Sequence, residues 1–156
     1  RFLSALLGEG SSSRLFLAVR EKLGITYQIN SFLNSYYDAS SFGVYFSTNI
    51  NQYDKVIDII FREFRKLKEK RISERELKKV KEYLKGGLLL NLENTTNRMM
   101  RMANSILYYN RIVSIEEYLK KIDSINADDI LKVANETLDE SQLIKVILKS
   151  VKVEEK

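Results

Sequence analysis

The stretch SSSRLFLAVREKLGITY, residues 11–27, carries an arginine and a tyrosine that could donate hydrogen bonds to a ligand. The residues three and four positions from Arg20 in a helix are all apolar or glycine, so no carboxylate on its own helix can pair with it. Its contacts must therefore come from elsewhere, and the ordinary interpretation is that its guanidinium meets a distant acid or that its stem lies over apolar surface. Tyr27 follows Gly24 closely, and its ordinary interpretation is a half-buried strand residue.

Composition excludes several kinds of site. The 156 residues include no histidine and no cysteine, which rules out disulfides and thiolate metal sites. A zinc site would have to rest on carboxylates alone, an unusual ligand set for this ion, so we expect this chain to hold no metal or other cofactor. The lack of cysteine leaves the compartment open, although we favour the cytoplasm.

The charge pattern argues against a nucleic-acid partner, and the length of the apolar runs argues against a membrane span. Basic and acidic side chains number 26 and 21, and the two signs are interleaved. The most basic run, residues 65–71, contains Glu69 and no aromatic platform, so we interpret it as a solvated helix face rather than a nucleic-acid site. Apolar runs such as residues 86–92 are far shorter than the roughly 20 residues that span a bilayer, so we expect no membrane span.

The elements that must position Arg20 and Tyr27 can be predicted from local patterns. A turn at residues 8–11 precedes a serine-capped helix that runs to about Lys22, and Gly24 closes it. We interpret the turn as an interhelical connection, not as an anion cradle, because it lacks the lysine of a phosphate-binding loop. Residues 25–29 and 41–48 alternate apolar with polar side chains, which predicts an antiparallel hairpin turning around residues 37–40.

Helical patterns occupy most of the remaining chain. Residues 52–70 place apolar side chains at intervals of three and four, as an amphipathic helix does. Four more helices are predicted to follow, starting at Ser73, at Thr95 or Thr96, at Ser114 and at Asn126. Glu76 and Glu117 each lie three residues after a capping serine and would complete capping boxes. We interpret Met99, Met100 and Met102 as adaptable core filler.

The run LIKVILKSV, residues 143–151, is rich in β-branched residues and is predicted to add a strand to the hairpin's sheet. The fold class is then α+β, a mostly antiparallel sheet with helices packed on one face. The chain starts at Arg1 without a start methionine, while Leu3, Leu6 and Leu7 already have helical spacing. We interpret residues 1–156 as a single domain, an N-terminally truncated fragment of a longer protein whose first strand is missing.

Several ordered blocks resemble one family. Residues 6–32, LLGEGSSSRLFLAVREKLGITYQINSF, are similar to the start of the C-terminal half-domain of the pitrilysin/insulinase family of zinc peptidases, particularly its mitochondrial-processing-peptidase-like branch. The family pattern there is Gly-x-x-Ser-Arg-Leu-Phe, followed by Arg-Glu-x-x-Gly-Leu-x-Tyr. The resemblance continues through residues 72–109 and 114–138, so it covers nearly the whole chain.

The resemblance implies one half of a clamshell, built from two similar α+β units. In this family zinc is held by the other half, through an inverted His-x-x-Glu-His motif and a further Glu, and this chain has no histidine to form that motif. The parent protein would then be a zinc metalloendopeptidase that cleaves peptides in an enclosed chamber. Its zinc would be bound by another domain or subunit, and this fragment alone would be inactive.

The resemblance also assigns roles by motif. Arg20 and Tyr27 would reach across the chamber to contact the substrate carbonyl and stabilise the tetrahedral oxyanion, because a planar guanidinium and a phenolic hydroxyl are both directed donors. The expected partners are a peptide substrate and a zinc-binding N-terminal half or partner subunit, in a homo- or heterodimer. The alternative is a non-catalytic scaffold or partner subunit of the same family.

Overall fold

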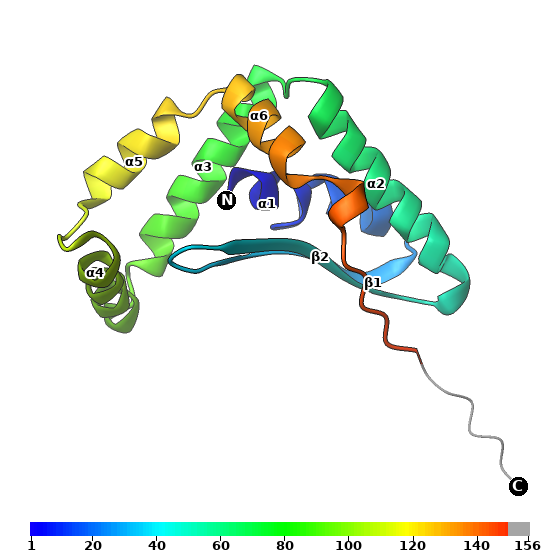
Figure 1. The fold of residues 1–156 in the computed structure, drawn as a ribbon, viewed down its shortest axis with the longest axis horizontal. Helices are drawn as coiled ribbons and strands as arrows, with labels where there is room; N and C mark the ends of the chain where they lie inside the picture. Colours follow the sequence, from blue (N-terminus) through cyan, green and yellow to red (C-terminus); the bar gives the residue numbers. More distant parts are fainter. Residues whose placement is uncertain (150–156) are drawn as a thin grey trace, which may run out of the picture.

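The computed structural model describes residues 1–149 and confirms the α+β class. Figure 1 shows an arch of helices on one side of a long β-hairpin, and none of the described elements on its other side. The described sheet consists of two antiparallel strands, β1 (Thr26–Ser35) and β2 (Ser40–Thr48). The predicted hairpin is therefore confirmed, and its first strand extends further than the alternating pattern indicates.

The hairpin has one buried and one open face. Ile29 lies opposite Phe46 in the register, and the two strands remain paired as far as Ser35 and Ser40. Ile29 and Ser31 are buried beneath the helices, while their neighbours Gln28 and Asn30 are exposed. This period of two is what a strand with one covered face requires.

The N-terminal segment is packed into the core. Helix α1 (Phe2–Leu7) buries five of its six residues and lies between the hairpin and the larger helices (Figure 1). Gly8 follows it so closely against β1 that its carbonyl accepts a hydrogen bond from the amide of Ser31 (3.4 Å). The next turn leads to η1 (Phe16–Glu21), a π-helical turn where an α-helix to Lys22 was expected.

Five α-helices complete the arch. After a short 3₁₀ turn, η2 (Ile50–Gln52), they are α2 (Tyr53–Glu69), α3 (Glu74–Asn91), α4 (Thr95–Tyr109), α5 (Ile115–Ser124) and α6 (Ala127–Thr137), followed by the 3₁₀ turn η3 (Glu140–Gln142). Helix α3 continues through Gly86 and Gly87 without interruption. The apolar face of α2, including Val56, Ile60 and Phe64, forms part of the core, as its periodicity predicted.

The capping boxes differ from the prediction. Ser73 and Ser114 accept hydrogen bonds from the amides of Glu76 and Glu117, as expected of N-caps. Both glutamate side chains instead bind arginines, because a forked charge-assisted pair is stronger than one bond to an amide. The complete capping box in α6 is formed by Asn126 and Asp129.

Two further predictions are wrong. Residues 143–149 form no strand, and the end of the predicted strand, residues 150–151, lies outside the described residues. A β-rich segment needs a neighbouring strand to pair with, and no described segment pairs with this one. Met99, Met100 and Met102 are about half exposed, not core, because α4 extends at one end of the arch (Figure 1).

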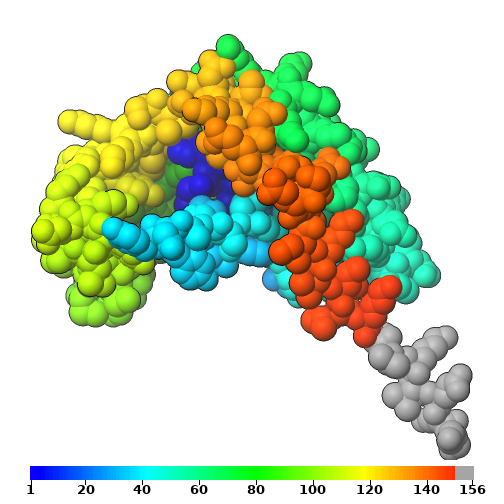
Figure 2. All heavy atoms as spheres, viewed as in Figure 1, coloured from blue at the N-terminus to red at the C-terminus, as the bar shows by residue number. Residues whose placement is uncertain are grey.

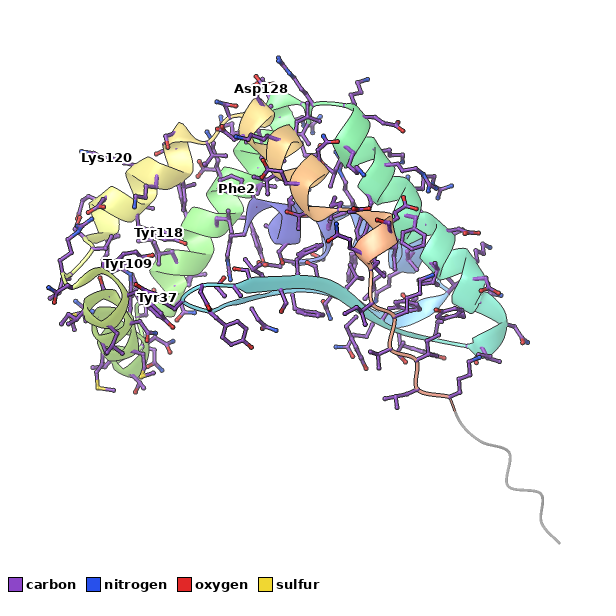
Figure 3. All side chains as sticks on the ribbon, viewed as in Figure 1. Phe2, Tyr37, Tyr109, Tyr118, Lys120 and Asp128 are labelled. Carbon is purple, nitrogen blue, oxygen red and sulfur yellow. The ribbon has the colours of Figure 1, made fainter. Side chains whose placement is uncertain are left out.

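The tip of the hairpin meets α4. Tyr37 lies at this tip (Figure 3), and its ring stacks on that of Tyr108 with 6.3 Å between centroids. Figure 2 shows the same approach in space-filling form, with the cyan tip against the yellow-green atoms of α4. The opposite end of the hairpin joins η1, and this end carries the two residues that the sequence singled out.

Candidate functional site

Arg20 lies in a π-helical turn. The amide of Lys22 donates to the carbonyl of Leu17 (3.1 Å), five residues earlier, in place of the four-residue spacing of an α-helix. Such turns are rare and occur frequently at functional sites, because the extra residue redirects the side chains that follow. The local backbone is therefore the first feature that distinguishes Arg20 from the other arginines.

The guanidinium of Arg20 is exposed and lies over an aromatic ring. Its central carbon is 4.9 Å from the centroid of the ring of Phe16, which lies four residues earlier in the chain. Within residues 1–149 it has no hydrogen-bond or ion-pair partner. An exposed cation–π contact of this kind stabilises the side chain by about 0.5–1 kcal/mol and leaves its N–H groups available to a ligand.

Tyr27 occupies a β-bulge. Thr26 pairs with Thr48 and Gln28 with Ser47, so Tyr27 is an extra residue with no partner on β2. Along these four residues of β1, from Thr26 to Ile29, burial runs buried, exposed, exposed, buried.

The bulge decides where Tyr27 points. A regular strand would put Tyr27 on the same covered face as Ile29, two residues later. The extra residue interrupts the alternation, and the side chain is instead 87% exposed. The expectation of a half-buried strand residue is therefore wrong.

A glycine joins the two irregular segments. Gly24 has φ of +61°, in the left-handed region that favours glycine, and no atom lies near the place that a Cβ would take. Its amide donates to the carbonyl of Arg20 (3.0 Å), and the amide of Ile25 donates to the carbonyl of Val19 (3.3 Å). The linker is thus bonded back onto η1, which fixes the π turn relative to β1.

Arg20 and Tyr27 are therefore exposed on adjoining elements, and they make no direct bond with each other in the described structure. Hollows of about 220 and 230 Å³ lie elsewhere, one beside Met102 and Val113 and the other beside Arg14 and Lys70. Because both side chains are exposed, the two donors sit on an open surface. An open surface becomes an enclosed site only when another surface faces it.

Reasoning from the sequence did not single out Arg14, which lies in the helical turn just before η1. Arg14 Nε lies 2.7 Å from Glu76 Oε1 and its Nη2 lies 2.8 Å from Oε2, while Nη1 is 3.7 Å from Glu63. Burial alone would lower the pKa of Arg14, but the hydrogen bonds and charge of Glu76 and the charge of Glu63 raise it. Glu76 lies 62 residues away, so helical periodicity carries no signal of this pair.

The described residues do not fit a zinc site. No group of three acidic, histidine or cysteine side chains that could hold a metal ion occurs among residues 1–149. Across the same residues, no helix is both long and apolar enough to cross a membrane. What this surface offers a ligand is hydrogen-bond donors.

Comparison with known sequences identifies relatives of this chain. The family model described as the Peptidase M16 inactive domain matches residues 1–84. YmxG of Bacillus subtilis, named an uncharacterized zinc protease, is 30% identical over 93% of this chain and 36% of its own length. A second protein of that description, from Streptomyces coelicolor, is 33% identical over 93% of this chain and 32% of its own length. The chain thus spans about a third of these relatives.

Solved structures agree on the fold. A protease from Helicobacter pylori superposes with a TM-score of 0.77 at 27% identity, over 90% of this chain and 34% of the protease. A peptidase M16 inactive domain from Pseudomonas fluorescens superposes with a TM-score of 0.74 at 19% identity, over 88% of this chain and 33% of that one. At 19% identity the second likeness concerns the fold alone.

Proposed function

Because the chain belongs to the Peptidase M16 inactive domain family, we propose that it is the metal-free half of a zinc metallopeptidase and supplies Arg20 and Tyr27 to the substrate. The metal would be held by another domain or subunit, since the residues described here do not fit it. The peptide would lie between the two halves, with this surface as one wall of the chamber.

The observation that carries the proposal is the coincidence of two exposed donors with two backbone irregularities. A π turn directs Arg20 and a bulge turns Tyr27 out of the covered face. Irregularities of this kind are costly to keep and are concentrated beside active sites. Neither side chain has a polar partner among residues 1–149, so both remain available to an external acceptor.

The chemistry follows from the donors. Negative charge develops on the carbonyl oxygen of a peptide under hydrolysis, and donors fixed in advance stabilise that charge without reorganising. The Arg20 guanidinium can bind one or two carbonyl oxygens with its planar fork, and the Tyr27 hydroxyl adds one directed donor. Losing one donor of this kind reduces kcat by roughly 10²–10³-fold in known cases.

The test uses the parent protein with its zinc-binding half. Arg20→Ala is expected to lower kcat/KM by roughly 10²-fold and Tyr27→Phe by roughly 10-fold, with zinc content unchanged. Arg62→Ala is the matched control, because Arg62 is also an exposed helical arginine that forms no ion pair within residues 1–149. Unchanged kinetics in both site variants would overturn the proposal, and a zinc-loaded parent that cleaves no peptide would favour a non-catalytic scaffold.

A further inference from the structure

Beyond the two donors themselves, we propose that Arg14 is a positioning residue. It fixes the π turn so that the Arg20 guanidinium is held where it meets the substrate carbonyl. The inference rests on the proposed function, since it concerns how Arg20 is held. Arg14 lies in the helical turn immediately before η1, six residues from Arg20. It takes no direct part in contacts with the substrate.

The geometry ties three helices together at Arg14. Its two forked bonds reach Glu76 at the start of α3, and its third nitrogen approaches Glu63 on α2. Glu63 is itself buried and also binds Lys66 (2.6 Å). A cation that two helices hold from different sides cannot shift without breaking charge-assisted bonds.

Other bonds hold the same stretch of backbone. Lys79 on α3 donates to the carbonyl of Ser12 (3.2 Å), and the Ser13 hydroxyl donates to the carbonyl of Gly10 (2.9 Å). Leu15 and Val19 are completely buried, which fixes the depth of the helix in the core. The polar bonds therefore surround Arg14 on the N-terminal side of the π turn.

The turn needs such external support. It spans only six residues, and helices that short have too few internal bonds to be stable without tertiary contacts. Its C-terminal end is bonded through Gly24 and Ile25, and its N-terminal end through Arg14. The burial of Leu15 and Val19 sets how deep the helix lies, and the forked pair adds a contact with one preferred geometry.

Lysine is the informative substitution. It keeps the positive charge near Glu63 and Glu76 but replaces the planar fork by a single ammonium, so direction is lost while charge is kept. In the zinc-loaded parent, Arg14→Lys is expected to lower kcat on the order of 10-fold with little change in KM, because small misplacements of a positioned group are costly. Glu76→Gln, which weakens the same fork from its other side, is expected to act in the same direction.

The matched control is Arg111→Lys. Arg111 forms an equally short fork with Glu117, also three residues after a capping serine, at the α4–α5 end of the molecule. Its substitution is expected to leave kcat within twofold of wild type. A loss of kcat there as large as in Arg14→Lys would contradict a positioning role specific to η1.

The decisive experiment is a double-mutant cycle between Arg14→Lys and Arg20→Ala, with kcat and KM measured for each protein. If Arg14 acts through Arg20, Arg14→Lys costs about 10-fold alone and nothing further in the Arg20→Ala background. Equal losses in both backgrounds, or unchanged kcat in Arg14→Lys, would overturn the inference while leaving the proposed function intact. If Arg20→Ala alone has wild-type kinetics, the proposed function itself fails and this inference fails with it.

Discussion

The two ends of this molecule each carry a forked arginine–glutamate pair, but the two pairs lie in different surroundings. Arg14 and Glu76 at the η1 end, and Arg111 and Glu117 at the α4–α5 end, both form two short forked bonds. The Arg14 side chain is only 21% exposed and its partner is 62 residues away, whereas Arg111 is 55% exposed and its partner is six residues away. The surroundings of such a fork, not the pair itself, decide how much it contributes to stability.

The surrounding surfaces show the same contrast. Around η1, residues such as Leu15 and Val19 are completely buried. Helix α4 buries only Ser105, whose hydroxyl donates to the carbonyl of Arg111 and accepts from the amide of Val113. The η1 end is thus held both by buried side chains and by the fork from Arg14 to a distant helix, which is what a positioned donor requires, while the α4 end depends on local bonds.

The largest expected effect comes from adding a methyl group at each end. A Cβ at Gly8 would collide with the backbone of Asn30 and Ser31, so Gly8→Ala is expected to destabilise the parent by about 3 kcal/mol. Gly87 in α3 has open space around it, and Gly87→Ala is expected to stabilise by about 1 kcal/mol through helix propensity. Urea unfolding measures the free energy of unfolding of both variants. If Gly8→Ala and Gly87→Ala are equally stable, the η1 end is not tightly packed.

The second expected effect is a difference between the two forks in how much each contributes to the free energy of unfolding. Arg14→Met leaves two carboxylates facing each other, one of them on the buried Glu63, and is expected to cost roughly 2 kcal/mol, below the range for fully buried pairs because Arg14 retains some exposure. Arg111→Met breaks an exposed pair and is expected to cost much less stability than Arg14→Met. The same unfolding measurement compares them, and a larger loss for Arg111→Met would contradict the difference in packing.

The smallest effect is a pH dependence at the α5 end. The hydrogen bonds from Arg111, aided by its charge and that of Lys121, lower the pKa of Glu117 from 4.5 to about 2. Because the folded pKa is the lower one, the stabilisation is present above pH 4.5 and is lost as the pH falls towards 2. An NMR titration of the Glu117 carboxyl should show this midpoint, and Arg111→Met should return it towards 4.5. A midpoint near 4.5 in the wild type would mean that the fork does not persist in solution.

Local patterns predicted the hairpin and the order of the helices, because alternation, spacing of three and four, and capping residues are properties of neighbouring residues. They could not predict the partner of Glu76, since Arg14 is brought to it only by the fold. The π turn and the bulge were missed for the same reason. Each inserts one extra residue into a regular pattern, and the bulge appears only in the pairing with β2.

The incorrect predictions concern surfaces that need a neighbour. Residues 143–149 are rich in β-branched side chains, which shows capacity for a strand, but no described segment pairs with them. The spacing of Met99 and Met102 is compatible with a helix, but spacing does not reveal what covers that helix. For Arg20, the sequence shows no carboxylate three or four residues away that could pair with it, and the structure shows no ion pair of Arg20 within residues 1–149.

The central claim is that Arg20 and Tyr27 act on the charge that develops during hydrolysis, not on substrate binding alone. A phosphinic analogue of a cleaved peptide mimics that charged tetrahedral state, so its inhibition constant can be compared with kcat/KM across the wild type, Arg20→Ala and Tyr27→Phe. We predict that the affinity for the analogue falls in proportion to kcat/KM, by roughly 10²-fold for Arg20→Ala. If the analogue binds both variants as tightly as the wild type while KM alone rises, the two residues do not stabilise the oxyanion and the account is wrong.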